Sequence, residues 1–260
     1  MTPHESALPL FDAHAHLYAA AFADDLDDVL DRAATQGVQV VLCVSETLAE
    51  AERVIELADR HPLIKPCAGL YPTILDRDAA AAMLDFIRQY QDRLVAIGEV
   101  GLDYWKVQDA ADREVQRDIL AQHIALSREL DMPLNVHSRS AGRHAIAWLR
   151  DNGARHVLLH AFDGKAATAR AGIEAGYYFS IPPSIVRSPQ KQKLVRHLPL
   201  EYLLLESDAP VLGPEKDVRN EPCNVWLSCQ HIAAIKGVPV EEVARITTAN
   251  AKRLFPRAFQ

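Results

Sequence analysis

The sequence has few cysteines, no long apolar run and no excess of positive charge. None of the four cysteines is at CxxC spacing from another, and we expect Cys43 and Cys67, inside apolar runs, to be buried reduced thiols. No apolar stretch approaches the roughly 20 residues that cross a bilayer. Residues 1–9 lack a basic segment followed by an apolar core. We therefore expect a cytoplasmic protein, monomeric, with neither a membrane span nor a secretory signal.

The charge balance limits the partners of the protein. With 28 basic and 35 acidic residues, the net charge of −7 argues against holding long nucleic acid by bulk electrostatics. Any contact with DNA should be transient and local. The best basic patch is the segment 187–196, with Lys191 and Lys193, for which a solvated helix face is the alternative interpretation.

Two catalytic and cofactor motifs are also absent. No G-x-G-x-x-G follows the first apolar run, which weakens an open doubly wound sheet, and no G-x-S-x-G supports a Ser/His/Asp triad. Instead, eight short apolar runs alternate with helical segments such as 24–36 and 112–130. The runs lie at 9–14, 38–44, 64–70, 94–99, 133–137, 156–161, 177–181 and 202–208. This pattern predicts an α/β protein, a single (β/α)8 TIM barrel over residues 1–260 with an extra C-terminal helix at 240–254. On length alone, two smaller domains are the alternative.

Histidines and carboxylates stand where five of these runs end. Active sites of α/β barrels collect at the carboxyl ends of the strands, so these side chains should meet at one face. They are His14, His16, Glu99, His137, His160 and Asp208. Four imidazoles and two carboxylates are the ligands of a dinuclear site for divalent metal ions. Zinc suits four imidazoles best, and manganese or magnesium are alternatives.

Neighbouring polar residues suggest further roles. Glu99 lies between two glycines that permit close backbone approach, and its two oxygens could bridge two metals, a salt bridge being the alternative. Asp208 is the candidate proton acceptor, and Glu206, on the same face of the eighth strand, would support it. Arg139 carries a planar fork suited to phosphate, unless it pairs with Asp103 or Glu206. For Asp103 itself, substrate contact and loop structure are equally supported.

The combined motifs resemble those of the TatD family of metal-dependent deoxyribonucleases in the amidohydrolase superfamily. The similar segments are Asp12-Ala13-His14-Ala15-His16, Gly98-Glu99-Val100-Gly101-Leu102-Asp103, His137-Ser138-Arg139, His160-Ala161-Phe162-Asp163-Gly164, Glu206-Ser207-Asp208-Ala209-Pro210 and Asn220-Glu221-Pro222. The stretch from 181 to 216 is similar to the branch that includes a vertebrate TatD-domain protein. The resemblance implies that the six ligands above hold metal and that Arg139 and Asn220 contact substrate. Tyr71 stands where the family usually has a histidine, which puts phosphate contact at that position in question.

Three functions are open at this point. The leading prediction is a phosphodiesterase that hydrolyses DNA ends, single strands or short oligonucleotides with a metal-bound hydroxide, with Asp208 and Glu99 as catalytic residues. The same metal pair could hydrolyse an amide or ester, including D-aminoacyl-tRNA. A barrel that binds a partner or stores metal without catalysis is the third.

Overall fold

The computed structural model describes residues 8–260, and their centre is a parallel sheet of eight strands in sequential order. The strands are β1 Leu10–Ala15, β2 Val38–Cys43, β3 Ile64–Ala68, β4 Ala96–Gly101, β5 Leu134–His137, β6 Val157–Leu159, β7 Tyr178–Ile181 and β8 Leu203–Leu205. Residues just beyond β8 close the sheet on β1. The Asp208 amide donates to the His14 carbonyl at 2.8 Å, and the His16 amide donates to the Ala209 carbonyl at 2.8 Å.

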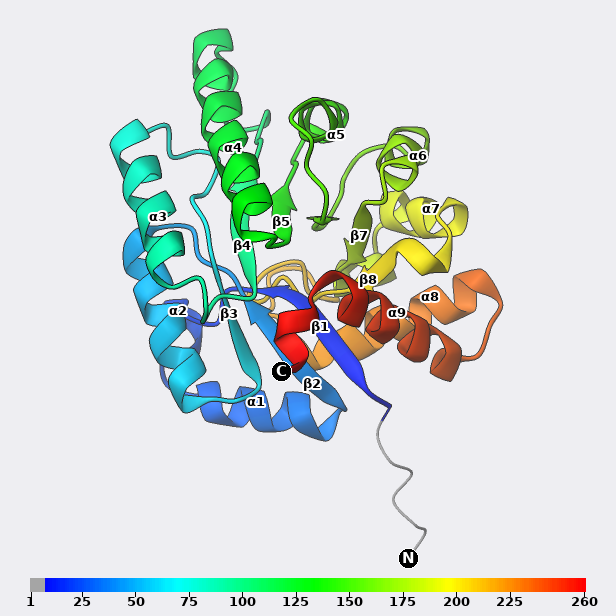
Figure 1. Cartoon of the computed structure of the whole chain (residues 1–260). Coiled ribbons are helices and arrows are strands. Elements are labelled where there is room, and N and C mark those ends of the chain that lie inside the picture. The colour runs from blue at the N-terminus through cyan, green and yellow to red at the C-terminus, as the bar shows by residue number, and fades with distance from the viewer. Residues whose placement is uncertain (1–7) are drawn as a thin grey trace, which may run out of the picture.

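Helices surround this barrel (Figure 1). They are α1 Leu26–Thr35, α2 Leu48–Arg60, α3 Arg77–Gln89, α4 Ala110–Leu130, α5 Gly142–Asp151, α6 Ala166–Glu174, α7 Pro189–His197, α8 Val225–Lys236 and α9 Val240–Leu254. Side-chain oxygens cap the first turns of α2, α3, α4 and α7. The predicted TIM barrel is therefore confirmed, and α9 is the predicted extra helix.

The C-terminal segment packs across the amino end of the barrel. Phe11 of β1 stacks on Phe255 and Phe259, with ring centroids 6.0 and 5.4 Å apart. Figure 1 shows this segment in front of the strands. Because the amino end is covered, the opposite end, where the strands finish, is left for a site.

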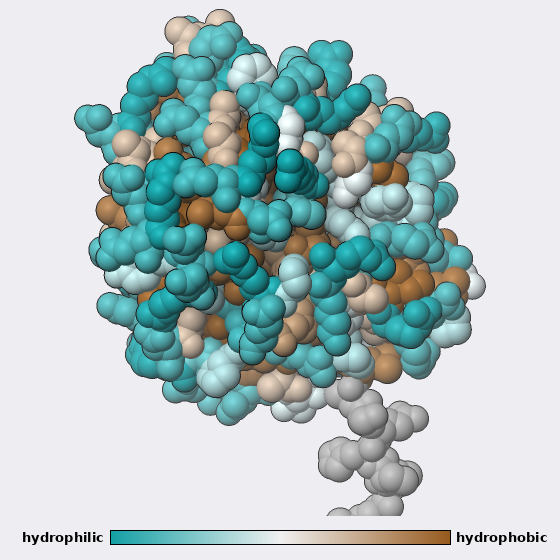
Figure 2. Space-filling model, viewed as in Figure 1, coloured by the Kyte–Doolittle hydropathy of each residue, from teal (hydrophilic) through white to brown (hydrophobic). Residues whose placement is uncertain are grey.

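No described helix is both long enough and apolar enough to span a membrane. On the face viewed in Figure 2, hydrophilic residues cover most of the surface. The expectation about a secretory signal concerns residues 1–9, of which 1–7 lie outside the described residues.

The eighth strand is shorter than predicted, and the prediction that Glu206 and Asp208 share one of its faces is wrong. The run 202–208 forms strand only at Leu203–Leu205, and Asp208 adopts a left-handed turn with φ 55°. Glu206 and Asp208 therefore do not share a strand face. Glu206 accepts from the Ser180 hydroxyl at 2.6 Å and from the Ala161 amide at 2.8 Å. Asp208 turns instead toward β1.

A buried histidine in α4 makes the stability of this fold depend on pH. His123 is fully buried, and burial lowers its pKa to about 4. The unfolded chain takes up a proton near pH 6.5, whereas the folded chain does not until about pH 4. Stability is therefore lost as the pH falls through this window. Between pH 7 and pH 5, His123→Leu should lose about 2 kcal/mol less of its free energy of unfolding than the parent protein. Urea unfolding of both proteins at these two pH values measures it, and parallel pH profiles would contradict it.

Candidate metal centre

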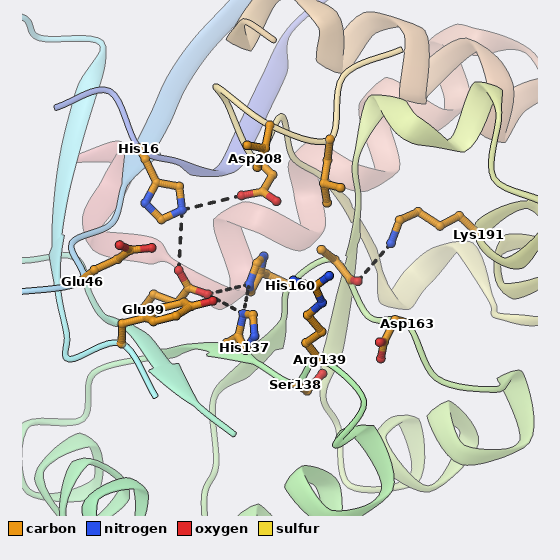
Figure 3. Close-up of a pocket in the computed structure, with 14 residues that line it drawn as sticks. His16, Glu46, Glu99, His137, Ser138, Arg139, His160, Asp163, Lys191 and Asp208 are labelled. Atoms are coloured by element: carbon orange, nitrogen blue, oxygen red, sulfur yellow. Dashed lines mark hydrogen bonds and ion pairs between the residues drawn. The ribbon is translucent and has the colours of Figure 1, made fainter. Parts of the chain in front are cut away.

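The six predicted ligands meet at the carboxyl end of the barrel. His14 lies near the end of β1, Glu99 within β4 and His137 at the end of β5, while His160 directly follows β6. His16 and Asp208 complete the cluster, and all of its members except the fully buried His14 line a cavity of about 410 Å³ (Figure 3). Five different strands supply these side chains, so the fold and not a local loop brings them together.

Glu99 stands between two pairs of imidazoles. Its Oε1 atom lies 2.7 Å from His137 Nδ1 and 2.9 Å from His160 Nε2. Its Oε2 atom lies 3.5 Å from His16 Nε2 and 3.7 Å from His14 Nε2. Each carboxylate oxygen thus faces one pair, which is the arrangement that a bridging ligand requires.

Asp208 joins the pair formed by His14 and His16. Its Oδ1 atom lies 3.5 Å from His14 Nε2 and 3.6 Å from His16 Nε2. The two histidine Nε2 atoms are themselves 3.1 Å apart. Neutral imidazoles and carboxylates, all turned toward shared points, fit divalent cations. This cluster could hold metal ions.

The charges within the cluster also favour a cation. Burial alone would raise the pKa of Glu99, but His160 and His137 outweigh burial and hold that pKa well below its usual range. Burial opposes protonation of His160, yet Glu99 and Glu206 raise the pKa of His160 well above its usual value. Protons on the imidazoles thus balance the charge of the buried carboxylates. A bound metal ion would displace these protons and supply the balancing charge itself. Burial lowers the pKa of His14 to about 3, which keeps that ring neutral.

Hydrogen bonds behind the rings fix their orientation. Asn135 accepts from His14 Nδ1 at 2.9 Å, and its amide donates to the Ala13 carbonyl at 2.8 Å. A donor at Nδ1 leaves the lone pair of His14 Nε2 pointing into the cluster. Asp12 accepts from the backbone amides of His14 at 3.2 Å and Ser207 at 2.7 Å. It therefore ties together the chain segments that carry His14 and Asp208.

The glycines around Glu99 allow strands to approach closely. A Cβ atom on Gly98 would lie 2.6 Å from the Asn135 Cβ, and one on Gly101 would overlap the His137 carbonyl oxygen. Gly101 also has φ +150°, which side chains rarely permit. Larger residues would push β4 away from β5 and separate Glu99 from His137.

Two of the four predicted substrate-binding residues line the cavity. The Arg139 guanidinium stacks 3.8 Å above the Trp105 ring and, among the described residues, forms no ion pair. The alternative pairing of Arg139 with Asp103 or Glu206 is thus not observed. Tyr71 lies on the cavity wall, its ring centroid 5.2 Å from that of His137.

The structure does not place the other two at the cavity. Asp103 is fully buried, and its Oδ2 atom lies 3.2 Å from His137 Nε2, so it orients that ring. Asn220 is also fully buried, and its amide donates to the Ser207 carbonyl at 2.6 Å and to the Val211 carbonyl at 2.8 Å. Neither side chain is free to contact substrate. Asn220 instead secures the turn that carries Asp208.

Two cavity residues, and the tryptophan that stacks on Arg139, were missed in the sequence. Glu46 follows β2, and its carboxylate lies close enough to His16 and Glu99 to be a further ligand. The rule used for the other strand ends would have found it. No sequence motif indicates that Trp105 stacks on Arg139. Lys191, on α7, was seen only as part of a basic patch, yet it is 7% exposed, and its ammonium donates to the Ala161 carbonyl at 3.0 Å.

Fold and site together define a parallel α/β barrel with a metal-binding cluster at the carboxyl end of its strands. A profile described as TatD related DNase matches residues 11–256. Human deoxyribonuclease TATDN3 is 48% identical over 263 residues, which cover 95% of each chain. The Bacillus subtilis metal-dependent hydrolase YabD is 33% identical and covers 95% of this chain and 98% of its own length.

The chain belongs to the TatD-related DNase family, as its motifs predict, and its similarity to a vertebrate TatD-domain protein is confirmed. Among solved structures, the Escherichia coli TatD homologue YjjV superposes with a TM-score of 0.89 at 24% identity. The superposition covers 96% of this chain and 99% of that one. At this identity it supports the fold alone.

Proposed function

We propose that this protein hydrolyses phosphodiester bonds of DNA at ends, in single strands or in short oligonucleotides, and that it uses two divalent metal ions. The position of Glu99 carries the proposal, because one carboxylate faces two separate pairs of imidazoles. The human relative named a deoxyribonuclease supports the same substrate class. Zinc suits the imidazoles, and manganese or magnesium are the alternatives to test.

Bound metal ions would act as Lewis acids toward the phosphoryl group and lower the pKa of water. The protein supplies the remaining functions. Asp208 accepts a proton from the attacking water as the new oxygen–phosphorus bond forms, and the proton then passes to the departing oxygen. Glu99 and the four imidazoles would hold the ions. Arg139 donates to the non-bridging phosphate oxygens, for which its unpaired guanidinium is well suited.

The state of Arg139 favours phosphate over an amide substrate. A guanidinium that lines the cavity without a carboxylate partner, held flat against Trp105, is set to bind an anion. A neutral amide would leave this charge without a partner. We therefore place hydrolysis of amides or esters second.

The test uses chelated protein restored with zinc, manganese or magnesium in turn. We expect cleavage of a labelled single-stranded oligonucleotide and of bis-p-nitrophenyl phosphate with at least one metal, and no turnover of N-acyl amino acids. Metal content by mass spectrometry should rise to two ions per chain. Hydrolysis of N-acyl amino acids without phosphodiester cleavage would favour the amidohydrolase alternative, and full metal occupancy without any hydrolysis would favour a binding protein.

A further inference from the structure

A second cavity lies between α6 and α7, which are neighbouring helices on the outside of the barrel (Figure 1). Its volume is about 860 Å³. We call it the α6–α7 groove. Its walls combine apolar side chains, such as Ile173 and Leu194, with exposed basic residues.

The groove is basic in a protein that is acidic overall. Lys165 and Arg170 from the α6 side and Lys193 from α7 line it, and Asp163 is the one carboxylate among its lining residues. Among the described residues, none of these three cations forms an ion pair. Elsewhere, arginines such as Arg219 pair closely with carboxylates. The three cations that line this groove are therefore free to bind an anionic ligand.

The groove lies beside the cavity at the metal centre. Asp163 lines both spaces, and α7 carries Lys191 into the cavity and Lys193 into the groove. Figure 3 shows Lys191 and Asp163 on the same side of the cavity, across from Glu46. Between them, the Gln190 amide donates to the Gly164 carbonyl at 2.8 Å and holds α7 against the turn before α6.

Lys191 lines the cavity, and its neighbour Gln190 lines the groove. In the part of the chain that the structure describes, the Lys191 ammonium donates one hydrogen bond, to the neutral Ala161 carbonyl, and it forms no ion pair. An ammonium has three donors, so this contact leaves two without a protein acceptor. The carboxylates of Glu206, Asp208 and Asp163 offset the cost of burying this cation only in part, and an anionic substrate group would reduce that cost further. Burial accordingly lowers the pKa of Lys191.

We infer that a single DNA strand passes from the metal centre across Lys191 into the α6–α7 groove, where Lys165, Arg170 and Lys193 bind its phosphates. This inference rests on the proposed function, which it extends from the scissile bond to the neighbouring nucleotides. Helix α7 has nine residues and is thus ~14 Å long, so the groove can contact only a few nucleotides beside the scissile bond. The groove lining contains no Phe, Tyr or Trp side chain for stacking, so its contacts should depend mainly on charge.

The experiment compares Lys165→Glu/Lys193→Glu with Arg196→Glu. Arg196 is an exposed cation of the same helix that does not line the groove, so it controls for long-range electrostatics. One readout is fluorescence anisotropy with a phosphorothioate octathymidylate, which resists hydrolysis. The other is turnover of bis-p-nitrophenyl phosphate, which is too short to reach the groove.

We expect the double variant to bind octathymidylate at least tenfold more weakly, with a salt slope reduced by about 1.4, since each phosphate contact on a single strand contributes about 0.7. Its kcat/KM for bis-p-nitrophenyl phosphate should match the parent protein, and Arg196→Glu should change affinity less than twofold. In the parent protein, affinity should rise with length over the first few nucleotides and then level off.

Unchanged affinity in the double variant, or an equal loss in Arg196→Glu, would overturn the inference. Failure of the proposed function gives a different result. In that case the parent protein would not hydrolyse bis-p-nitrophenyl phosphate at all, while the anisotropy measurement would still decide whether the groove binds the strand.

Discussion

Glu99→Gln should reduce bound metal from two ions to fewer than one and lower phosphodiester turnover by on the order of 10³-fold. Both groups of imidazoles depend on this one carboxylate, with His137 at 2.7 Å from one oxygen and His16 at 3.5 Å from the other. A neutral amide offers one weak oxygen ligand in place of two charged ones. Metal content by mass spectrometry and turnover of bis-p-nitrophenyl phosphate measure the two effects.

Glu46→Gln is the matched control for loss of one negative charge in the same cavity. Glu46 lines the cavity but is not placed between the two imidazole pairs, so this variant should keep both ions and lose at most about tenfold in turnover. Circular dichroism and thermal unfolding establish that both variants fold. Glu99→Gln protein with two ions and parental turnover would show that Glu99 does not hold the centre together.

Asp208→Asn should keep at least one metal ion and lose turnover by about 10²- to 10⁴-fold. The amide oxygen can still occupy the position 3.5 Å from His14 Nε2, but it cannot accept the proton of the attacking water. Most of the effect should therefore fall on kcat and not on KM. Steady-state kinetics at matched metal content measure it.

Asp163→Asn serves as the comparison for Asp208. Asp163 also lines the cavity, but its carboxylate accepts from the Ser140 amide at 2.9 Å and does not face the imidazoles. Its kcat should stay within a few-fold of the parent value. Undiminished turnover in Asp208→Asn, with equal metal content, would refute the role of Asp208 as proton acceptor.

The barrel was predictable because its strands are local features. A buried parallel strand is a short apolar run, such as Val157 to Leu159, and can be recognised without knowledge of its neighbours. The ends of strands were harder to predict. Beyond Leu205, the left-handed turn at Asp208 depends on its bonds with β1, where its amide donates to the His14 carbonyl. No pattern within 202–208 encodes those bonds.

Substrate contacts were harder to predict than ligands. Asp103 and Arg139 both follow a strand end by two or more residues, yet one is buried behind His137 and the other faces the cavity. The conformation of the loop after each strand decides whether the side chain is buried or faces the cavity. Asn220 was misplaced for a similar reason, since its amide satisfies carbonyls of the loop after β8.

The sequence alone determined the order of the strands, the family and the set of metal-ligand candidates, because in a parallel barrel every strand delivers its last residues to one face. Only the tertiary structure decided which polar neighbours line the cavity, which imidazoles each Glu99 oxygen faces, and that the α6–α7 groove lies beside the cavity, with Asp163 lining both. Those facts depend on loop conformation and on packing between elements far apart in the chain, which residue spacing does not record.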